Sequence, residues 1–180
     1  MENLKGSLLV AGGQLFDPNF RKAVVLMAEG GEEGAMGLVL NRPAPVSVEE
    51  AVPSLASLVP PGAPLFLGGP VEPEQALVLA EFEDPILAGT LVLGSIGLPM
   101  SGLAPEDLRG IRRARVFAGF AGWGPGQLEG ELAMSAWIVE PALPDDVFTE
   151  DPDQLWSKVL KRKGGNYRLL ALMPWDPSTN

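Results

Sequence analysis

The chain has 180 residues, of which 46% are hydrophobic and 20% are charged, a composition typical of one soluble globular domain with a sizeable core. It contains no cysteine and no histidine, which excludes disulfides, thiolate nucleophiles and every catalytic or metal site that depends on imidazole. The net charge of −10 disfavours nucleic acid as a partner, because phosphate backbones bind to basic surfaces. No apolar run reaches about 18 residues and no signal peptide is recognisable, so we expect a cytoplasmic protein that does not bind membranes.

The first part of the chain predicts a hairpin of buried strands and one short helix. Apolar runs bounded by turn residues are typical of strands, and a serine followed three residues later by glutamate is typical of a helix start. We therefore expect strands over 4–10, 23–28 and 35–40, a turn over 16–20, and a helix that begins at the capping box Ser47-Val48-Glu49-Glu50 and ends at Pro53.

The remainder of the chain predicts more strands than helices. We expect strands over 65–67, 76–82, 90–93, 114–120, 136–139 and 167–173, an edge extension over 146–148, and irregular chain over 94–102 and in the Pro-rich tail. One helical turn is expected over 105–109 and a helix over 127–134. The clearest helix start is Asp151-Pro152-Asp153-Gln154, with aspartate at the N-cap and proline at the first position, and this helix should end near Lys163. Without strict alternation of strand and helix, the pattern favours an α+β domain.

A glycine-rich stretch over 117–132 is the most unusual feature of the sequence. It reads F-A-G-F-A-G-W-G-P-G-Q-L-E-G-E-L and predicts a strand, a loop and a helix in that order. Glycines allow another surface to approach the backbone closely, so the stretch serves either close packing or a binding surface around Trp123. It lacks the lysine of a P-loop and the third glycine of the dinucleotide fingerprint, which disfavours nucleotide binding.

Several polar residues follow strand ends or flank this stretch, where loops on a rigid sheet commonly supply binding groups. The candidate binding residues are Asn19, Asn41, Arg42, Gly69, Trp123, Gln127 and Glu129. The alternative is that they form turns and helix caps, as Asn41 before Arg42-Pro43 would do without any ligand.

A dense basic cluster also precedes the glycine-rich stretch. It consists of Arg109, Arg112, Arg113 and Arg115. Four guanidiniums in seven residues can hold an anion or an acidic partner, but the favoured interpretation is a solvated face that offsets Glu106 and Asp107. The acidic pairs of the chain lack the ligand order of a calcium loop, so we expect no metal.

Four segments together resemble the bacterial YqgE/AlgH family: D-P-N-F at 17–20, G-A-M-G-L-V-L-N-R-P at 34–43, G-G-P-V at 68–71 and A-G-W-G-P-G-Q-L-E at 121–129. The resemblance implies a single α+β domain over residues 1–180. In it, a bifurcated, mostly antiparallel or mixed sheet folds into a pseudo-barrel with short flanking helices. Many relatives carry Glu-His where Glu29-Gly30 stands here and a histidine near Ala80, so we expect no imidazole-dependent mechanism.

These features favour a non-catalytic binding or regulatory protein that uses its Gly-rich, Trp-containing face. We expect no cofactor and an unidentified protein or small molecule as partner. One branch of the resembled family is labelled a transcriptional regulator, which makes DNA-binding regulation the second hypothesis, although no helix-turn-helix pattern with a basic second helix is visible. The third is a hydrolase or transferase that uses carboxylates. A homo-oligomer could form if the strand over 76–82 lies at a sheet edge and pairs across a twofold axis.

Overall fold

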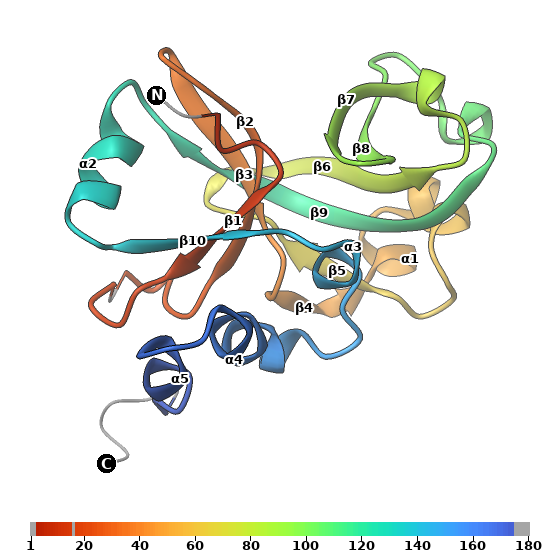
Figure 1. Ribbon diagram of the computed structural model, residues 1–180. Coiled ribbons are helices and arrows are strands. Elements are labelled where there is room, and N and C mark those ends of the chain that lie inside the picture. The colour runs from red at the N-terminus through yellow and green to blue at the C-terminus, as the bar shows by residue number, and fades with distance from the viewer. Residues whose placement is uncertain (1–2, 16, 175–180) are drawn as a thin grey trace.

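The computed structural model describes residues 3–15 and 17–174, and within them ten strands form one curled, mostly antiparallel sheet with short helices at its margins (Figure 1). The strands are β1 Ser7–Ala11, β2 Val24–Gly31, β3 Gly34–Val39, β4 Pro43–Ser47, β5 Pro64–Leu67, β6 Val71–Phe82, β7 Ala88–Leu93, β8 Ile96–Pro99, β9 Ile111–Trp123 and β10 Trp137–Pro141. The α-helices are α1 Val48–Ala51, α2 Gln127–Ala133, α3 Pro144–Val147, α4 Pro152–Lys163 and α5 Tyr167–Leu170, and the 3-10 helices are η1 Pro53–Leu58, η2 Pro85–Leu87 and η3 Pro105–Asp107.

The sheet divides at β9, its longest strand. The strand order is β10-β1-β2-β3-β9-β6-β8-β7, and the β4–β5 pair branches from β9. Near its C-terminal end β9 pairs antiparallel with β3, whereas three residues further back it pairs parallel with β5, through Phe117 and Ala118. The expected α+β fold with a bifurcated, curled sheet is thus confirmed.

Long apolar runs form the centre of the sheet, as the sequence predicts. The β2–β3 hairpin is confirmed, with Val25 opposite Val39 and Leu26 opposite Leu38. A bulge between Met27 and Glu29 follows. The side chains of β2 and β3 belong to the apolar clusters on both faces of the sheet. Burial on both faces explains why these strands read as continuous rather than alternating apolar runs.

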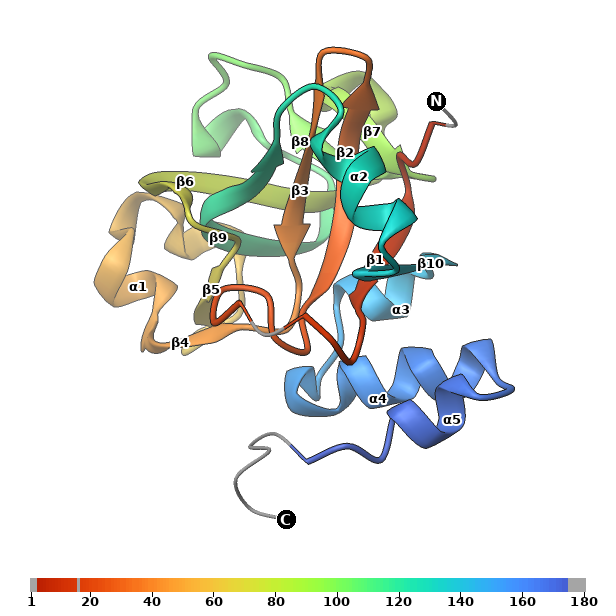
Figure 2. The same ribbon diagram turned by 90° about the vertical axis from the view of Figure 1, so that its left-hand side faces the viewer.

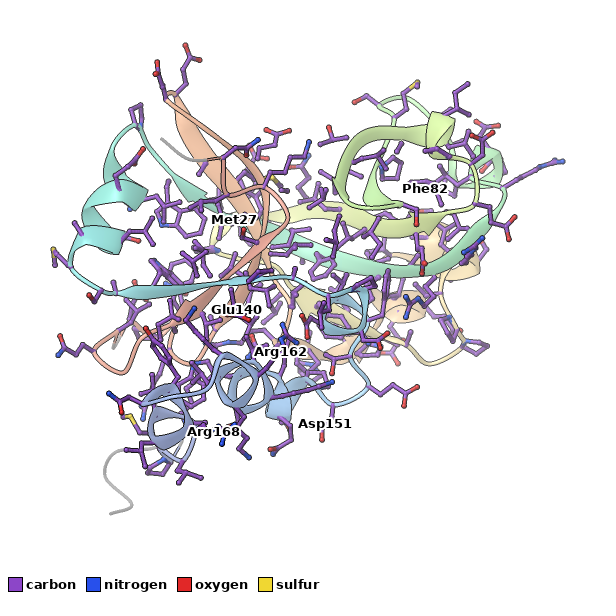
Figure 3. The ribbon with its side chains drawn as sticks, in the orientation of Figure 1. Met27, Phe82, Glu140, Asp151, Arg162 and Arg168 are labelled. Atoms are coloured by element: carbon purple, nitrogen blue, oxygen red, sulfur yellow. The ribbon has the colours of Figure 1, made fainter. Side chains whose placement is uncertain are left out.

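Helices α4 and α5 lie side by side below the sheet (Figure 2). The start of α4 at Pro152 and its end at Lys163 agree with the prediction. Its buried face includes Trp156, whose indole N–H donates to the carbonyl of Ala11 at 3.0 Å. The ion pairs of Arg162 with Asp146 and Glu140 also join α4 to α3 and β10, and Figure 3 shows Glu140 close to Arg162. Helix α4 is therefore fixed to the sheet by polar as well as apolar contacts.

Two predicted strands are wrong because both segments are helical. The segment over 146–148 belongs to α3 and its C-cap, for which Pro144 at the first position and Asp146 at the third provide the start signal. The segment over 167–173 contains α5, which packs against α4, and the Ser157 hydroxyl donates to the carbonyl of Ala171 at 2.9 Å.

Two strands were not predicted, and one predicted strand is covered on only part of its second side. Strand β4 starts at a proline, and β8 lies in the segment that was expected to be irregular. The strand over 76–82 pairs with β9 along its length, whereas β8 covers its other side only at Ala80 and Glu81. That the remainder of this edge pairs with a second copy stays a prediction.

The turn over 16–20 is confirmed from Asp17 onward, since the amide of Asn19 donates to the Asp17 carboxylate at 2.9 Å. Phe16 and the tail beyond residue 174 lie outside the described residues. Among the helices in the described ranges, none combines the length and apolar character of a transmembrane segment.

Candidate functional site

Asn41 and Arg42 hold the loop before β2 against the end of β3. Asn41 is 3% exposed, its side-chain oxygen accepts from the amide of Val24 at 3.0 Å, and its side-chain nitrogen donates to the carbonyl of Lys22 at 2.8 Å. The guanidinium of Arg42 donates to the carbonyl of Arg21, and burial lowers the pKa of Arg42. Both hydrogen bonds of the Asn41 amide are intramolecular, so they support the alternative of local structural work.

Gly69 lies where the chain between β5 and β6 crosses β9. A Cβ at this position would lie 2.2 Å from the carbonyl carbon of Phe120, and the backbone has φ of +153°. Gly119 on β9 makes the matching approach, with its Cβ position 2.6 Å from the carbonyl oxygen of Gly69. These glycines allow two backbones to touch. Of the two interpretations of the glycine-rich stretch, close packing describes this crossing.

The indole of Trp123 is buried rather than displayed. It is 6% exposed and packs against Phe20 and Trp137. Its N–H donates at 2.8 Å to Oε2 of Glu131, which also accepts from the indole of Trp137 at 2.8 Å. The ring therefore has its hydrogen-bond partner inside the protein, and the expected Trp-containing contact face is not formed by Trp123.

The indole pair depends on Glu131, a residue that the sequence analysis did not single out. Gln127 is exposed and donates to Oε1 of the same carboxylate at 3.3 Å. The signal for this role was the i, i+4 spacing of Gln127 and Glu131 on one helix face. Glu129, half-buried in the first turn of α2, does not take part in this set of hydrogen bonds.

We expect the substitution Glu131→Gln to lower the free energy of unfolding by about 1–3 kcal/mol, because two buried indole donors lose a charged acceptor. Denaturant unfolding followed by tryptophan fluorescence measures the change. The variant Glu129→Gln, on the same helix, should change stability by less than about 1 kcal/mol. Equal losses in the two variants would contradict the role given to Glu131.

The seven sequence-predicted residues differ in exposure, since Asn41 and Trp123 are buried whereas Asn19 and Gln127 are exposed. Trp123 pairs with Ala35 at the start of β3, whereas Asn41 follows the end of that strand. Measured along β3 at ~3.3 Å per residue, the Cα positions of these two residues are about 20 Å apart. Asn19 precedes Phe20, whose ring stacks on Trp123. That any of these residues contacts a partner stays a prediction.

The basic cluster, by contrast, lines a hollow of about 660 Å³, which we call the arginine cleft. Its lining comprises residues 57–60, 63, 64, 66, 112–115 and 148–150, with Pro43 and Pro152. The cleft therefore lies between the η1–β5 loop, the α3–α4 loop and the N-terminal part of β9. Arg109, the fourth member of the cluster, is outside the lining.

Arg115 is the central cation of the cleft. Its guanidinium lies 4.6 Å from the ring centre of Phe66 and donates to the carbonyls of Val147 and Thr149. Burial, with a smaller contribution from the charge of Arg113, lowers the pKa of Arg115 to about 10, against an opposing effect of Glu150. Arg115 is therefore still protonated at neutral pH and holds the α3–α4 loop against the sheet.

Arg113 and Arg112 differ in how much of their charge is already paired. Arg113 lies 4.4 Å from the ring centre of Phe148, and its Nε is 2.7 Å from the carboxylate of Glu81. Arg112 is exposed, and within residues 3–15 and 17–174 no carboxylate forms an ion pair with it. A bulge in the β6–β9 pairing falls at Arg112, between Arg113 opposite Glu81 and Ile111 opposite Phe82. Bulges of this kind redirect side chains, which explains how consecutive arginines line one cleft.

The arginine cleft thus combines three guanidinium groups with aromatic walls. In the described part of the chain, no group of three or more Asp or Glu side chains is arranged to hold a metal ion. The sequence analysis identified these arginines but favoured a solvated face for them. It could not place Phe66 and Phe148 beside them, because those rings come from distant segments.

Comparison with known proteins agrees over nearly the whole chain. A UPF0301 protein of Streptomyces coelicolor is 43% identical over 187 aligned residues, which cover 100% of this chain and 97% of that protein. A UPF0301 protein of Mycobacteroides abscessus is 40% identical, over 97% of this chain and 87% of that protein.

Two solved structures have the same fold. The crystal structure of a Corynebacterium diphtheriae protein superimposes with a TM-score of 0.86 at 27% identity, covering 96% of this chain and 94% of that one. The solution structure of AlgH from Pseudomonas aeruginosa gives a TM-score of 0.72 at 32% identity, covering 96% and 95%. The AlgH-like family matches residues 8–168. The chain therefore belongs to the AlgH-like family, as its sequence motifs indicated.

Proposed function

We propose that this protein is a non-catalytic binding protein that holds a carboxylate-bearing ligand in the arginine cleft. The observation that carries the proposal is the gathering of Arg112, Arg113 and Arg115 with two aromatic rings around a hollow of about 660 Å³. Ligand pockets have volumes of this order and combine apolar walls with a few polar groups. Guanidinium groups match carboxylates in geometry as well as in charge.

The chemistry of the lining supports recognition rather than reaction. Guanidiniums remain protonated at neutral pH, and Arg115 keeps its charge even with its pKa lowered to about 10. An acid–base catalyst needs a pKa close to the working pH. The arginines of the cleft therefore suit binding and orientation of an anion, and they do not suit proton transfer to it.

We expect Arg112→Glu to weaken binding of a carboxylate ligand at least tenfold, because this cation faces the cleft without a carboxylate partner of its own. The probe is N-acetylglutamate, titrated into ¹⁵N-labelled protein while the amide signals of the cleft lining are followed. Binding should also weaken as salt is raised, since screening reduces the attraction between exposed charges.

The matched control is Arg109→Glu, which introduces the same charge change three residues earlier, outside the lining. It should alter the dissociation constant less than twofold. If Arg109→Glu and Arg112→Glu weaken binding equally, overall charge and not the cleft is responsible. If N-acetylglutamate does not shift the signals of the lining at all, the proposed function is wrong.

A further inference from the structure

We propose that the ligand of the arginine cleft is an extended acidic peptide, which adds to the open edge of β9 as a further strand. This inference rests on the proposed function and names the class of partner. It is carried by the backbone of β9 and by the apolar wall of the cleft, neither of which the charge argument uses.

The edge of β9 that faces the cleft is open. On that side β9 pairs with β5 only at Phe117 and Ala118, and further along with β3. The amide of Gly68 donates to the carbonyl of Ala118 at 2.9 Å, so the backbone groups of Ala118 point toward β5. Backbone groups alternate sides along a strand, so those of Ala114 point the same way, beyond the start of β5.

Ala114 thus presents its N–H and C=O to the cleft, and it is part of the lining. Within the described residues, no hydrogen bond from a side chain, turn or loop reaches either group. The backbone N–H and C=O groups of the neighbouring Arg113 and Arg115 point to the other side of β9, where these residues lie opposite Glu81 and Leu79 of β6. An unpaired donor and acceptor on a strand edge form a template for an added strand.

The two walls of the cleft fit side chains that alternate along such a strand. One wall belongs to the apolar cluster that contains Ala114, Leu58 and Val59. The other carries the guanidiniums of Arg113 and Arg115 on the rings of Phe148 and Phe66. Because successive residues of a strand point to opposite faces, a bound peptide would place apolar side chains against the first wall and acidic ones against the second.

Charge complementarity indicates the sign of the partner's charge. The chain has a net charge of −10, so its surface as a whole repels an acidic segment. The cleft concentrates three of the 13 lysines and arginines, with Glu150 as the opposing carboxylate in the lining. Like-charge repulsion elsewhere and attraction at the cleft direct an acidic strand to this edge.

The probe for this inference is the peptide Glu-Val-Glu-Val-Glu, acetylated and amidated at its ends. Two N-methylated versions are compared with it, one methylated at both valines and the other at the first two glutamates. Only one set of amides can donate to β9, because alternate N–H groups of a strand face opposite sides. We expect one version to lose binding more than tenfold and the other to bind within about threefold of the parent. If both methylated versions bind equally well, the peptide does not add to β9 as a strand and the inference is wrong.

Amide hydrogen exchange provides a second readout in the same complex. Saturating peptide should slow exchange of the Ala114 amide at least tenfold, because this N–H gains an acceptor. The Arg115 amide, which faces β6, is the internal reference and should change less than twofold. An Ala114 amide that exchanges at the same rate with and without peptide would also overturn the inference.

Failure of this inference and failure of the proposed function give different results. If N-acetylglutamate binds in an Arg112-dependent manner and the peptide does not, the ligand is a small anion and the strand is excluded. If neither probe shifts the signals of the lining, both proposals fall. If a second copy of this chain occupied the edge, the Ala114 amide would be protected in a concentration-dependent manner without any peptide, and the acidic-peptide inference would be wrong.

Discussion

Arg162→Met is expected to lower the free energy of unfolding by about 3–5 kcal/mol, because it leaves a buried carboxylate without its cation. Asp146 is fully buried, and its two carboxylate oxygens accept from Arg162 at 2.9 and 2.8 Å. One of these oxygens also accepts from the amide of Leu143 at 2.8 Å. Methionine retains much of the packing of the arginine stem and removes only the charge and the hydrogen bonds.

The control for this prediction is Lys161→Met, an exposed position one residue earlier in α4, which should change stability by less than about 0.5 kcal/mol. Chemical denaturation at constant pH measures both variants. The hydrogen bonds that Arg162 donates to Asp146 raise the pKa of Arg162, so the stabilisation is fully present at neutral pH and is lost as pH rises through that raised pKa. The difference between the variants should therefore be constant from about pH 6 to 9. A loss that varies strongly across this interval, or equal losses in both variants, would contradict the explanation.

Gly69→Ala should cost about 4 kcal/mol or more, or prevent folding altogether. The added Cβ would lie 2.2 Å from both the carbonyl carbon and the oxygen of Phe120, and φ is +153°. Neither obstruction is the end of a flexible side chain that could move aside. The chain between β5 and β6 would have to move away from β9. A lower unfolding temperature or a lower yield of soluble protein would show this change.

Gly130→Ala is the matched control, because it makes the same substitution in the interior of α2. A Cβ there has no other atom within 4 Å, and alanine favours helix by roughly 0.5–1 kcal/mol over glycine. This variant should therefore be more stable than the parent. If Gly69→Ala unfolds at the temperature of the parent, the close crossing of the two backbones is wrong.

Local signals explain which elements could be predicted from the sequence. The start of α4 was identifiable because Asp151 and Pro152 form a start signal that needs no knowledge of the rest of the chain, and the hairpin of β2 and β3 followed from two apolar runs around a polar turn. For the segment containing Tyr167, strand and helix remain equally compatible with its apolar content. Contact with α4 decides the outcome, and the sequence does not display that contact.

The candidate site shows the same division. The clustering of Arg112, Arg113 and Arg115 was visible in the sequence. The cleft that they line also needs Phe66 and Phe148, which the branching of the sheet brings next to them. Trp123 attracted attention through its glycine neighbours, although its indole is enclosed by Phe20 and Trp137. Unusual local composition therefore located a tight crossing of the backbone, whereas the concave surface arose from tertiary structure.

The pairing of β1 with β10 has a consequence for how the protein is made. Ser7 lies opposite Pro141, and Ala11 opposite Trp137, so one side of the first strand stays without its neighbour until most of the polypeptide has left the ribosome. Unpaired strand edges are sites of aggregation, and pairings between residues distant in sequence form slowly. Synthesis of this protein thus includes an interval in which one edge of the apolar strand β1 is unpaired, and shortening the chain before β10 should yield insoluble product.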